Sequence, residues 1–246
     1  MKGLYKTNMR KLMKSKFYIL GLIIAMVATF AFTKNMMNFT GIFESMGDTG
    51  RMHFISAAIV AFFTIYTPLF VCEEYSEGSI KNKIISGFTQ KQIFIAGLLA
   101  QLSAVLIMWV IFFISGLAGG GRMTGYWMGS LLITLLAILG YTTLIYAIAF
   151  RLEKPIRSTI VAFVLLNLNF NMITFGNLLI MISKGVVLKI AAIVYNISVL
   201  GQWFVLTGLA EDTANPGPLC QILTAVIVLV VSIAYGTIKL NKRDLK

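Results

Sequence analysis

Charged side chains are scarce in this chain of 246 residues, where 12% are Asp, Glu, Lys or Arg and 58% are hydrophobic. Soluble domains carry about 25% charged residues, because water has to solvate most of their surface. The chain also has a single histidine, two cysteines and four prolines. The lack of charge excludes an ordinary water-soluble domain and predicts a protein embedded in a membrane.

The few charges are mostly basic, with 21 Lys and Arg against 9 Asp and Glu and a formal net charge of +12. A basic balance often indicates nucleic-acid binding, but a nucleic-acid module clusters its basic residues on a soluble core. The hydrophobic composition argues against that class. We therefore expect no nucleic-acid partner, and we take the distribution of the charges as a signal of membrane insertion.

Six runs free of Asp, Glu, Lys, Arg and His are long enough to cross a bilayer as helices, which takes about 17–25 residues. Because every backbone polar group in lipid has to be paired within its own segment, such runs form helices. The sequence thus predicts an all-α membrane protein with a single transmembrane domain over residues 1–246. The expected spans are residues 17–33, 54–72, 93–118, 126–150, 158–182 and 218–238.

The segments between these runs divide the basic residues unevenly. Alternate segments share a side of the membrane, and one set holds 16 Lys and Arg while the other holds 5. Since positive charge accumulates on the cytoplasmic side, both termini are predicted to be cytoplasmic. We expect a multi-pass protein of a cell membrane, the plasma membrane of a bacterium.

A further apolar stretch, residues 185–209, does not fit this count. Lys189, Asn196, Gly201 and Gln202 divide it into two pieces that are too short to cross. A crossing would also move the basic C-terminal tail to the outer side, against the charge bias. We predict a re-entrant or interfacial helical hairpin on the outer face, before span six.

Residues 1–16 have the pattern of an amphipathic helix. We expect it at the inner membrane interface, with its apolar stripe in lipid and its cations on anionic headgroups. Membrane lipid is therefore an expected partner. The cations are Lys2, Lys6, Arg10 and Lys14, and the apolar stripe is Leu4, Tyr5, Met9, Leu12 and Met13.

The loop between spans two and three contains a short helical pattern at about residues 78–88. Gly87 is expected to end it, and Thr89 is placed to cap the next helix. A half-apolar helix at the inner surface fits a groove on another protein. Its apolar face consists of Ile80, Ile84, Ile85 and Phe88, with Lys81, Asn82 and Lys83 pointing elsewhere.

The run EYSEGSIKNKIISGFTQKQIFIAGLL resembles the segment after the second span in type-2 ATP-binding cassette (ABC) permeases. In that family a Glu ends the span, Gly-Thr/Ser-Ile/Leu-Lys opens the loop helix, and Ser/Thr-Arg/Lys precedes span three. Gln90 stands where the family often has Arg, with a base one position later. The sequence similarity covers about 20 residues, and the topology agrees over the whole chain. The matching residues are Glu74, Gly78, Ser79, Lys81, Gly87, Thr89 and Lys91.

This resemblance implies that the loop helix is the coupling helix, which inserts into a cytosolic ABC ATPase subunit. The chain would be the permease subunit of an ATP-driven exporter, paired with a second permease copy. ATP and Mg²⁺ would bind in the ATPase, so we expect no cofactor in this chain. The coupling residues would be Glu74, Gly78, Ser79, Ile80, Lys81, Lys83, Ile84, Ile85 and Phe88.

The expected substrate is amphipathic or hydrophobic. Short permeases of six spans without large outer domains resemble the exporters of bacteriocins, lantibiotics and toxin-like peptides. We therefore favour a peptide over a lipid or a drug.

The chain lacks the motifs of other energy sources and of catalysis. No P-loop occurs, and the predicted spans hold no ionisable group to relay protons, although a Na⁺ site of backbone and hydroxyl oxygens needs none. Glu73 and Glu74 are followed by Gly78 where E-E-x-x-x-R intramembrane proteases have Arg. His53, expected as a polar tip at the outer interface, cannot build a metal site alone. An ATP-independent secondary transporter is an alternative, and a membrane-embedded enzyme is a weaker one.

Span five carries polar side chains on one face. Asn167, Asn171 and Thr174 are spaced i, i+4 and i+7, and Asn169 lies off that face. Amides of this kind join neighbouring transmembrane helices. The alternative is that the three residues line the translocation path on the axis of a permease dimer.

Overall fold

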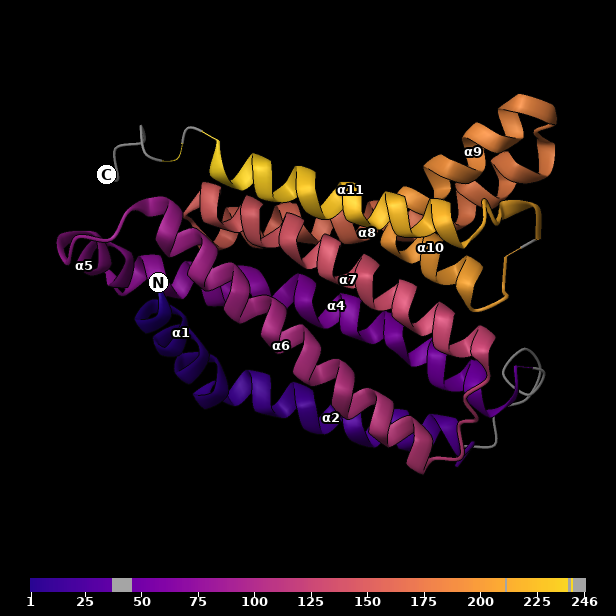
Figure 1. Ribbon diagram of the computed structural model, residues 1–246, viewed down its shortest axis with the longest axis horizontal. Coiled ribbons are helices and arrows are strands. Elements are labelled where there is room, and N and C mark those ends of the chain that lie inside the picture. The colour runs from indigo at the N-terminus through magenta and orange to yellow at the C-terminus, as the bar shows by residue number, and fades with distance from the viewer. Residues whose placement is uncertain (37–45, 211, 239, 241–246) are drawn as a thin grey trace.

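The computed structural model describes residues 1–36, 46–210, 212–238 and 240, and every regular element in these ranges is a helix (Figure 1). Six helices are long and apolar enough to cross a membrane, which indicates a multi-pass membrane protein. Each contains a predicted span completely or to within one residue. They are α2 Lys16–Thr33, α4 Gly47–Ser76, α6 Gln90–Ala118, α7 Gly125–Leu152, α8 Pro155–Ile182 and α11 Pro218–Thr237.

The long helices run along the long axis of the molecule and reverse direction from one to the next (Figure 1). One end holds α1 (Lys2–Lys14), α5 (Ser79–Ile85), the turn from α7 to α8 and the finish of α11. We call it the α5 end. The opposite end, the α9 end, holds the turn from α6 to α7 together with α9 (Gly185–Ile197) and α10 (Val199–Leu206).

Helices α4, α6 and α7 form the centre of the bundle. At least half of the residues in their most apolar stretches are buried, whereas in α2, α8 and α11 fewer than a third are. The three outer helices therefore present broad apolar surfaces, as helices in contact with lipid do. Aromatic rings hold α2 to α4, where Phe17 and Phe62 stack with ring centroids 5.5 Å apart, and the Tyr18 hydroxyl donates to the Ala104 carbonyl of α6 at 2.9 Å.

The N-terminal helix α1 forms as predicted, and two residues of its apolar stripe pack inside the protein. Leu4 and Leu12 of its apolar stripe are buried in the protein core, and the Tyr5 hydroxyl lies 3.0 Å from the Ser103 hydroxyl of α6. Only Met13 of the stripe is exposed. Part of the stripe therefore packs on α6, which offers it an apolar face, whereas Tyr5 and Met9 are half-buried. The four cations on the opposite face are exposed, as predicted: Lys2, Lys6, Arg10 and Lys14.

The apolar stretch before α11 folds as the two short helices α9 and α10, bent by 107° at Ser198. Both lie at the α9 end, where α8 finishes and α11 begins (Figure 1). The Ser198 hydroxyl accepts a hydrogen bond from the Gly201 N–H at 3.2 Å and so caps α10. Most of α10 is buried against α7 and α8, whereas α9 has a large exposed apolar surface.

Candidate functional site

The corner that joins α4 to α6 through α5 is the first candidate site. Gly78 has φ 68° and Gly87 has φ 88°, a backbone conformation that side chains other than glycine rarely adopt. These two residues bound α5, which is shorter than the predicted 78–88. Thr89 then caps α6 in a reciprocal pair with Gln92, whose amide oxygen accepts from the Thr89 N–H at 3.0 Å. The predicted roles of Gly87 and Thr89 are confirmed.

The apolar face predicted for this corner points mostly into the chain itself. Ile80 is 1% exposed, and Ile84 and Phe88 pack partly against the core. Ile85 is 83% exposed. Periodicity placed Ile80 and Ile84 on one side of the helix, and that side packs on the ends of α4 and α6, but Phe88 lies beyond the end of α5. Ile85, at its edge, is the apolar side chain left for a partner.

Two of the predicted coupling residues form a buried ion pair. The Lys83 ammonium donates to a Glu74 carboxylate oxygen at 2.7 Å and to the Asn8 side-chain oxygen at 3.0 Å. Glu74 is 4% exposed, and the side chain of Lys83 is 13% exposed. Because opposite charges and an amide satisfy one another here, the charges can stay away from water. The pair joins α1, α4 and α5 at a single point.

A second set of ion pairs, more exposed than the first, joins α1 to the C-terminal end of α4. The Lys11 ammonium lies 2.8 Å from Glu77 and 3.3 Å from Glu73. Partial burial acts to lower the pKa of Lys11, but the two carboxylates outweigh it and raise this pKa above its usual 10.5. The hydrogen bond from Lys11 lowers the pKa of the Glu77 carboxyl below its usual 4.5. Both groups are therefore charged over the physiological range.

A groove of about 300 Å³ runs beside α5 toward the turn from α7 to α8. Tyr75, which lines this groove, connects α4 to α7 through a hydrogen bond from its hydroxyl to the Phe150 carbonyl at 2.8 Å. Lys81 and Lys154 on its walls are exposed. The exposed surface of the corner thus combines Ile85 with a basic groove, lined by Tyr75, Ser76, Ile80, Lys81, Glu153, Lys154 and Pro155.

The polar face of α8 is exposed. Asn167, Asn171 and Thr174 all lie on the outer surface of the bundle. The Asn171 amide donates to the Asn167 carbonyl at 2.9 Å, which satisfies one of its two N–H groups within the helix. The exposure of this face leaves its polar side chains accessible from outside the bundle.

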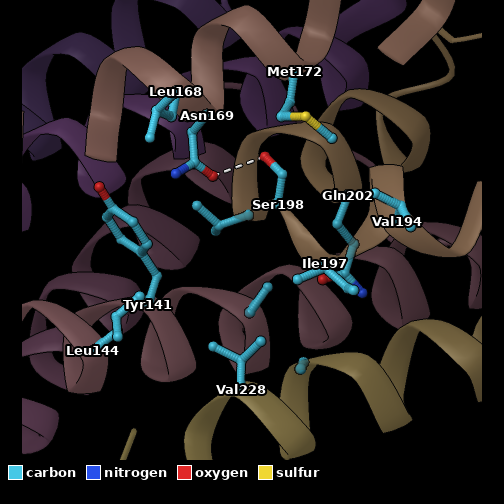
Figure 2. A pocket seen from close by; sticks show the side chains of 13 residues that line it. Tyr141, Leu144, Leu168, Asn169, Met172, Val194, Ile197, Ser198, Gln202 and Val228 are labelled. Atoms are coloured by element: carbon cyan, nitrogen blue, oxygen red, sulfur yellow. Dashed lines mark hydrogen bonds between the residues drawn. The ribbon is translucent and has the colours of Figure 1, made fainter. Parts of the chain in front are cut away.

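Asn169, on the opposite side of α8, belongs to the second candidate site. It lies on the wall of a pocket of about 320 Å³ between α7, α8, α11 and the bend from α9 to α10 (Figure 2). The Ser198 hydroxyl donates to the Asn169 side-chain oxygen at 2.7 Å. The other lining residues are mostly apolar: Ala137, Tyr141, Leu144, Leu168, Met172, Val194, Ile197, Val199, Gln202, Ala225 and Val228.

A buried amide network behind this pocket fixes α9, α10 and α11 together. The Gln202 amide donates to the Gln221 carbonyl at 2.8 Å, and the Gln221 amide donates to the Asn196 side-chain oxygen at 3.2 Å. Asn196 in turn donates to the Ala214 carbonyl at 3.0 Å. Asn196 and Gln202 were recognised in the sequence only as interruptions of an apolar stretch. Polar amides within an otherwise apolar stretch are the sequence signal that they pair with other helices.

His53 does not lie at an exposed interface as predicted. Its ring is fully buried, with Nε2 2.9 Å from the Thr134 hydroxyl of α7. Its backbone carbonyl accepts from the Trp203 indole N–H at 3.2 Å. The correction has a simple cause: α4 begins at Gly47, so His53 lies nearly two turns inside the helix and faces α7.

Within the described ranges, no three His, Cys, Asp or Glu side chains come together as a metal site would require. No protein-family model matches the chain, and comparisons with curated proteins and with solved structures find no significant similarity either.

Proposed function

We propose that this chain is the membrane-spanning subunit of an ATP-driven exporter of the type-2 ABC kind, and that it is not itself an enzyme. A separate cytosolic ATPase binds ATP and Mg²⁺ and supplies the energy. The observation that carries the proposal is the α4–α5–α6 corner. A helix of seven residues, set between two left-handed glycines, is fixed at one end of the bundle with an apolar residue exposed.

The contacts of α5 suit it to receive a mechanical force. The Lys83–Glu74 pair ties α5 to α4, and Asn8 ties both to α1. The Thr89–Gln92 cap fixes the N-terminus of α6, with Thr89 two residues beyond Gly87. A push on α5 by the ATPase therefore acts on α1, α4 and α6 together, and two of these are central helices of the bundle.

In this proposal the ATPase contacts the exposed part of the corner, which is Ile85 together with the basic groove at Lys81 and Lys154. Ile80, Ile84, Lys83 and Glu74 then act from inside the chain by holding α5 in place. The α5 end, which carries the basic residues of α1, of the α5 corner and of the turn from α7 to α8, faces the cytoplasm of a bacterial cell. The α9–α10 pair is a re-entrant element on the outer side.

The translocation path is proposed to run beside α8. A second permease copy covers the face with Asn167, Asn171 and Thr174, whose amides need hydrogen-bond partners in the membrane. Such a path, polar on one side and apolar around it, suits an amphipathic peptide of the bacteriocin, lantibiotic or toxin type.

The first test is co-purification of the tagged chain from its native membranes. The wild-type chain is expected to bring down an ATPase with a P-loop, identified by mass spectrometry. An Ile85→Asp variant should recover about 10- to 100-fold less of it, since one buried apolar side chain contributes about 1.5–3 kcal/mol. Ile85→Leu, which keeps the apolar surface, is the matched control and should bind almost normally.

Two results would contradict the proposal. One is the absence of any P-loop ATPase from the wild-type preparation. The other is substrate export that continues after ATP is depleted while an ion gradient is kept, which is the behaviour of a secondary transporter. Equal recovery of the ATPase with the wild-type chain and with Ile85→Asp would show that Ile85 of α5 does not contact the ATPase.

A further inference from the structure

The seam between α2 and α4 has two adjoining hollows that the export mechanism does not use. The first, of about 310 Å³, lies where α1 passes into α2, and the second, of about 140 Å³, follows α2 away from that point. Phe17 lines both. We propose that together they bind one anionic phospholipid of the leaflet at the α5 end, with an acyl chain along α2 and the phosphate at Ser15. This site does not depend on an ATPase partner, because all the residues that form it belong to this chain.

The first hollow lies at the depth of the lipid headgroups. Helix α2 has 18 residues and is about 27 Å long, slightly less than the hydrocarbon thickness of about 30 Å. Because α2 has to cross this thickness, its first residue lies at the boundary with the headgroups. Ser15, which caps α2, lines the first hollow. The hollow extends along α4 from Tyr66 to Glu73, which is about 10 Å, so it reaches from this boundary toward water.

The second hollow has the length that an acyl chain needs. It follows α2 over residues 17–29, which is about 18 Å, and the hydrocarbon of one leaflet is about 15 Å deep. The small side chains of Gly21 and Ala25 leave room along it. Leu20 and Ile24 line it and are each about half exposed, so they form its edge toward the bilayer. An acyl chain can therefore enter it sideways from the lipid.

The walls of the second hollow suit hydrocarbon. None of its lining residues carries a formal charge. Thr29 is the one lining residue with a side-chain hydroxyl, and that hydroxyl donates to the Ala25 carbonyl at 2.6 Å. A peptide backbone would bring several N–H and C=O groups that these walls could not pair, whereas an acyl chain brings none over this length.

The charges around the first hollow favour an anionic headgroup. Lys14 and Lys16 flank Ser15 in the chain, and both are exposed. Glu73 lines the hollow, but the Lys11 ammonium lies 3.3 Å from its carboxylate and reduces its repulsion of a phosphate. The N-terminus of α2, which begins here, also favours an anion. Positive charge thus prevails at the level where a phosphate would lie.

Two hydroxyl groups in the first hollow indicate a ligand with acceptor oxygens. The Ser15 hydroxyl accepts from the Tyr18 N–H at 3.4 Å, and its own O–H can donate. Tyr66 is 3% exposed, and its hydroxyl lies close to Ser15 but makes no hydrogen bond of normal geometry among the described residues. A buried hydroxyl without a partner is costly. The oxygens of a phosphate are acceptors of the kind that these groups lack.

The experiment uses the full chain in nanodiscs of phosphatidylcholine with a trace of a probe lipid, which carries a photoreactive diazirine near the end of one acyl chain. The probe is either phosphatidylglycerol, which is anionic, or phosphatidylcholine, which is zwitterionic. After illumination, mass spectrometry maps the labelled residues. At Ala25 and Ala28, the ratio of anionic to zwitterionic labelling is expected to be several-fold higher than at Ile227, an exposed residue in the middle of α11.

Filling the second hollow should remove this excess. Ala28→Phe places a ring in the hollow and is expected to lower the ratio at Ala25 to that at Ile227. Val27→Phe, at the neighbouring exposed position of α2, is the matched control and should leave the ratio unchanged. If Ala28→Phe does not fold, as judged by gel filtration, Leu20→Trp fills the hollow from its lipid side and Ala25 is again the readout.

The position of the phosphate is tested by Lys16→Gln. The ratio at Ala25 should fall about fivefold, since one lysine near an anionic headgroup contributes about 1 kcal/mol. Lys2→Gln, which removes an exposed cation at the other end of α1, is the control and should have no effect. An equal effect of both variants, or none of Lys16→Gln, would overturn the placement of the phosphate at Ser15. A wild-type ratio at Ala25 no higher than at Ile227, or an excess that survives both filling variants, would overturn the lipid site itself.

Discussion

At the scale of single residues, the pair of Lys83 and Glu74 has the largest expected effect. Glu74→Gln leaves the Lys83 ammonium buried with only Asn8 as its partner, and breaking a buried pair in this way costs about 3–5 kcal/mol. A double variant, Glu74→Gln with Lys83→Met, removes both charges and should recover most of this loss. Unfolding in denaturant, followed by tryptophan fluorescence, measures both free energies.

The control for this prediction lies one turn away. Glu77→Gln removes a carboxylate of an exposed pair with Lys11, and such pairs contribute at most about 1 kcal/mol. Equal loss of stability in Glu74→Gln and in the double variant would show that the two charges do not depend on each other.

At the scale of elements, the attachment of α1 should depend on pH. Glu77 has a lowered pKa, so its contribution is complete above its usual 4.5 and is lost as the pH falls through the lower value in the folded protein. Lys11 has a raised pKa, so its contribution is complete below 10.5 and is lost as the pH rises further. The attachment of α1 to α4 is therefore strongest between these limits.

A spin label on α1 would measure this attachment. With Cys72 and Cys220 replaced by Ala, a label at Thr7→Cys is expected to become more mobile below about pH 4 and to stay constant from about pH 5 to 10. Lys11→Met should abolish the step at low pH. A step that persists in Lys11→Met would assign it to other groups.

At the scale of the whole molecule, the exposed polar face of α8 predicts an assembly of two copies. In the same cysteine-free background, Asn171→Cys should form a cross-linked dimer in native membranes. Phe170→Cys is the control, because the preceding residue points about 100° away around the helix. Preferential cross-linking at Phe170, or at neither position, would place the contact elsewhere.

The sequence predicted the bundle well because each of its signals is local. Apolar length defines a span, and Gly87 and Thr89 define the corner through backbone conformation and capping. What an apolar face packs against is decided by distant segments. Leu12 and Ile80 therefore looked like surface residues in their own helices, whereas α6 and the end of α4 bury them.

The pocket between α7, α8, α11 and the bend from α9 to α10 could not be predicted from the sequence, because distant segments form it. Asn169 appeared as an outlier from the polar face of α8, and Ser198 as one residue in a broken apolar stretch. Their hydrogen bond depends on the 107° bend that brings α9 and α10 back against α8. The direction of α10 after the break at Ser198 cannot be derived from the sequence pattern, because the helical repeat does not continue through the break.

The packing of α1 on α6 also has a consequence for biosynthesis. Asn8 precedes Lys83 by 75 residues, and Tyr5 precedes Ser103 by 98. At about 5–20 residues per second, the ribosome makes these partners about 4–20 s after α1. During that interval α1 has an apolar stripe, a row of cations and no α6 to cover it. The apolar stripe of α1 is therefore uncovered until α6 has been made, and the contacts of α1 with α6 form late in synthesis.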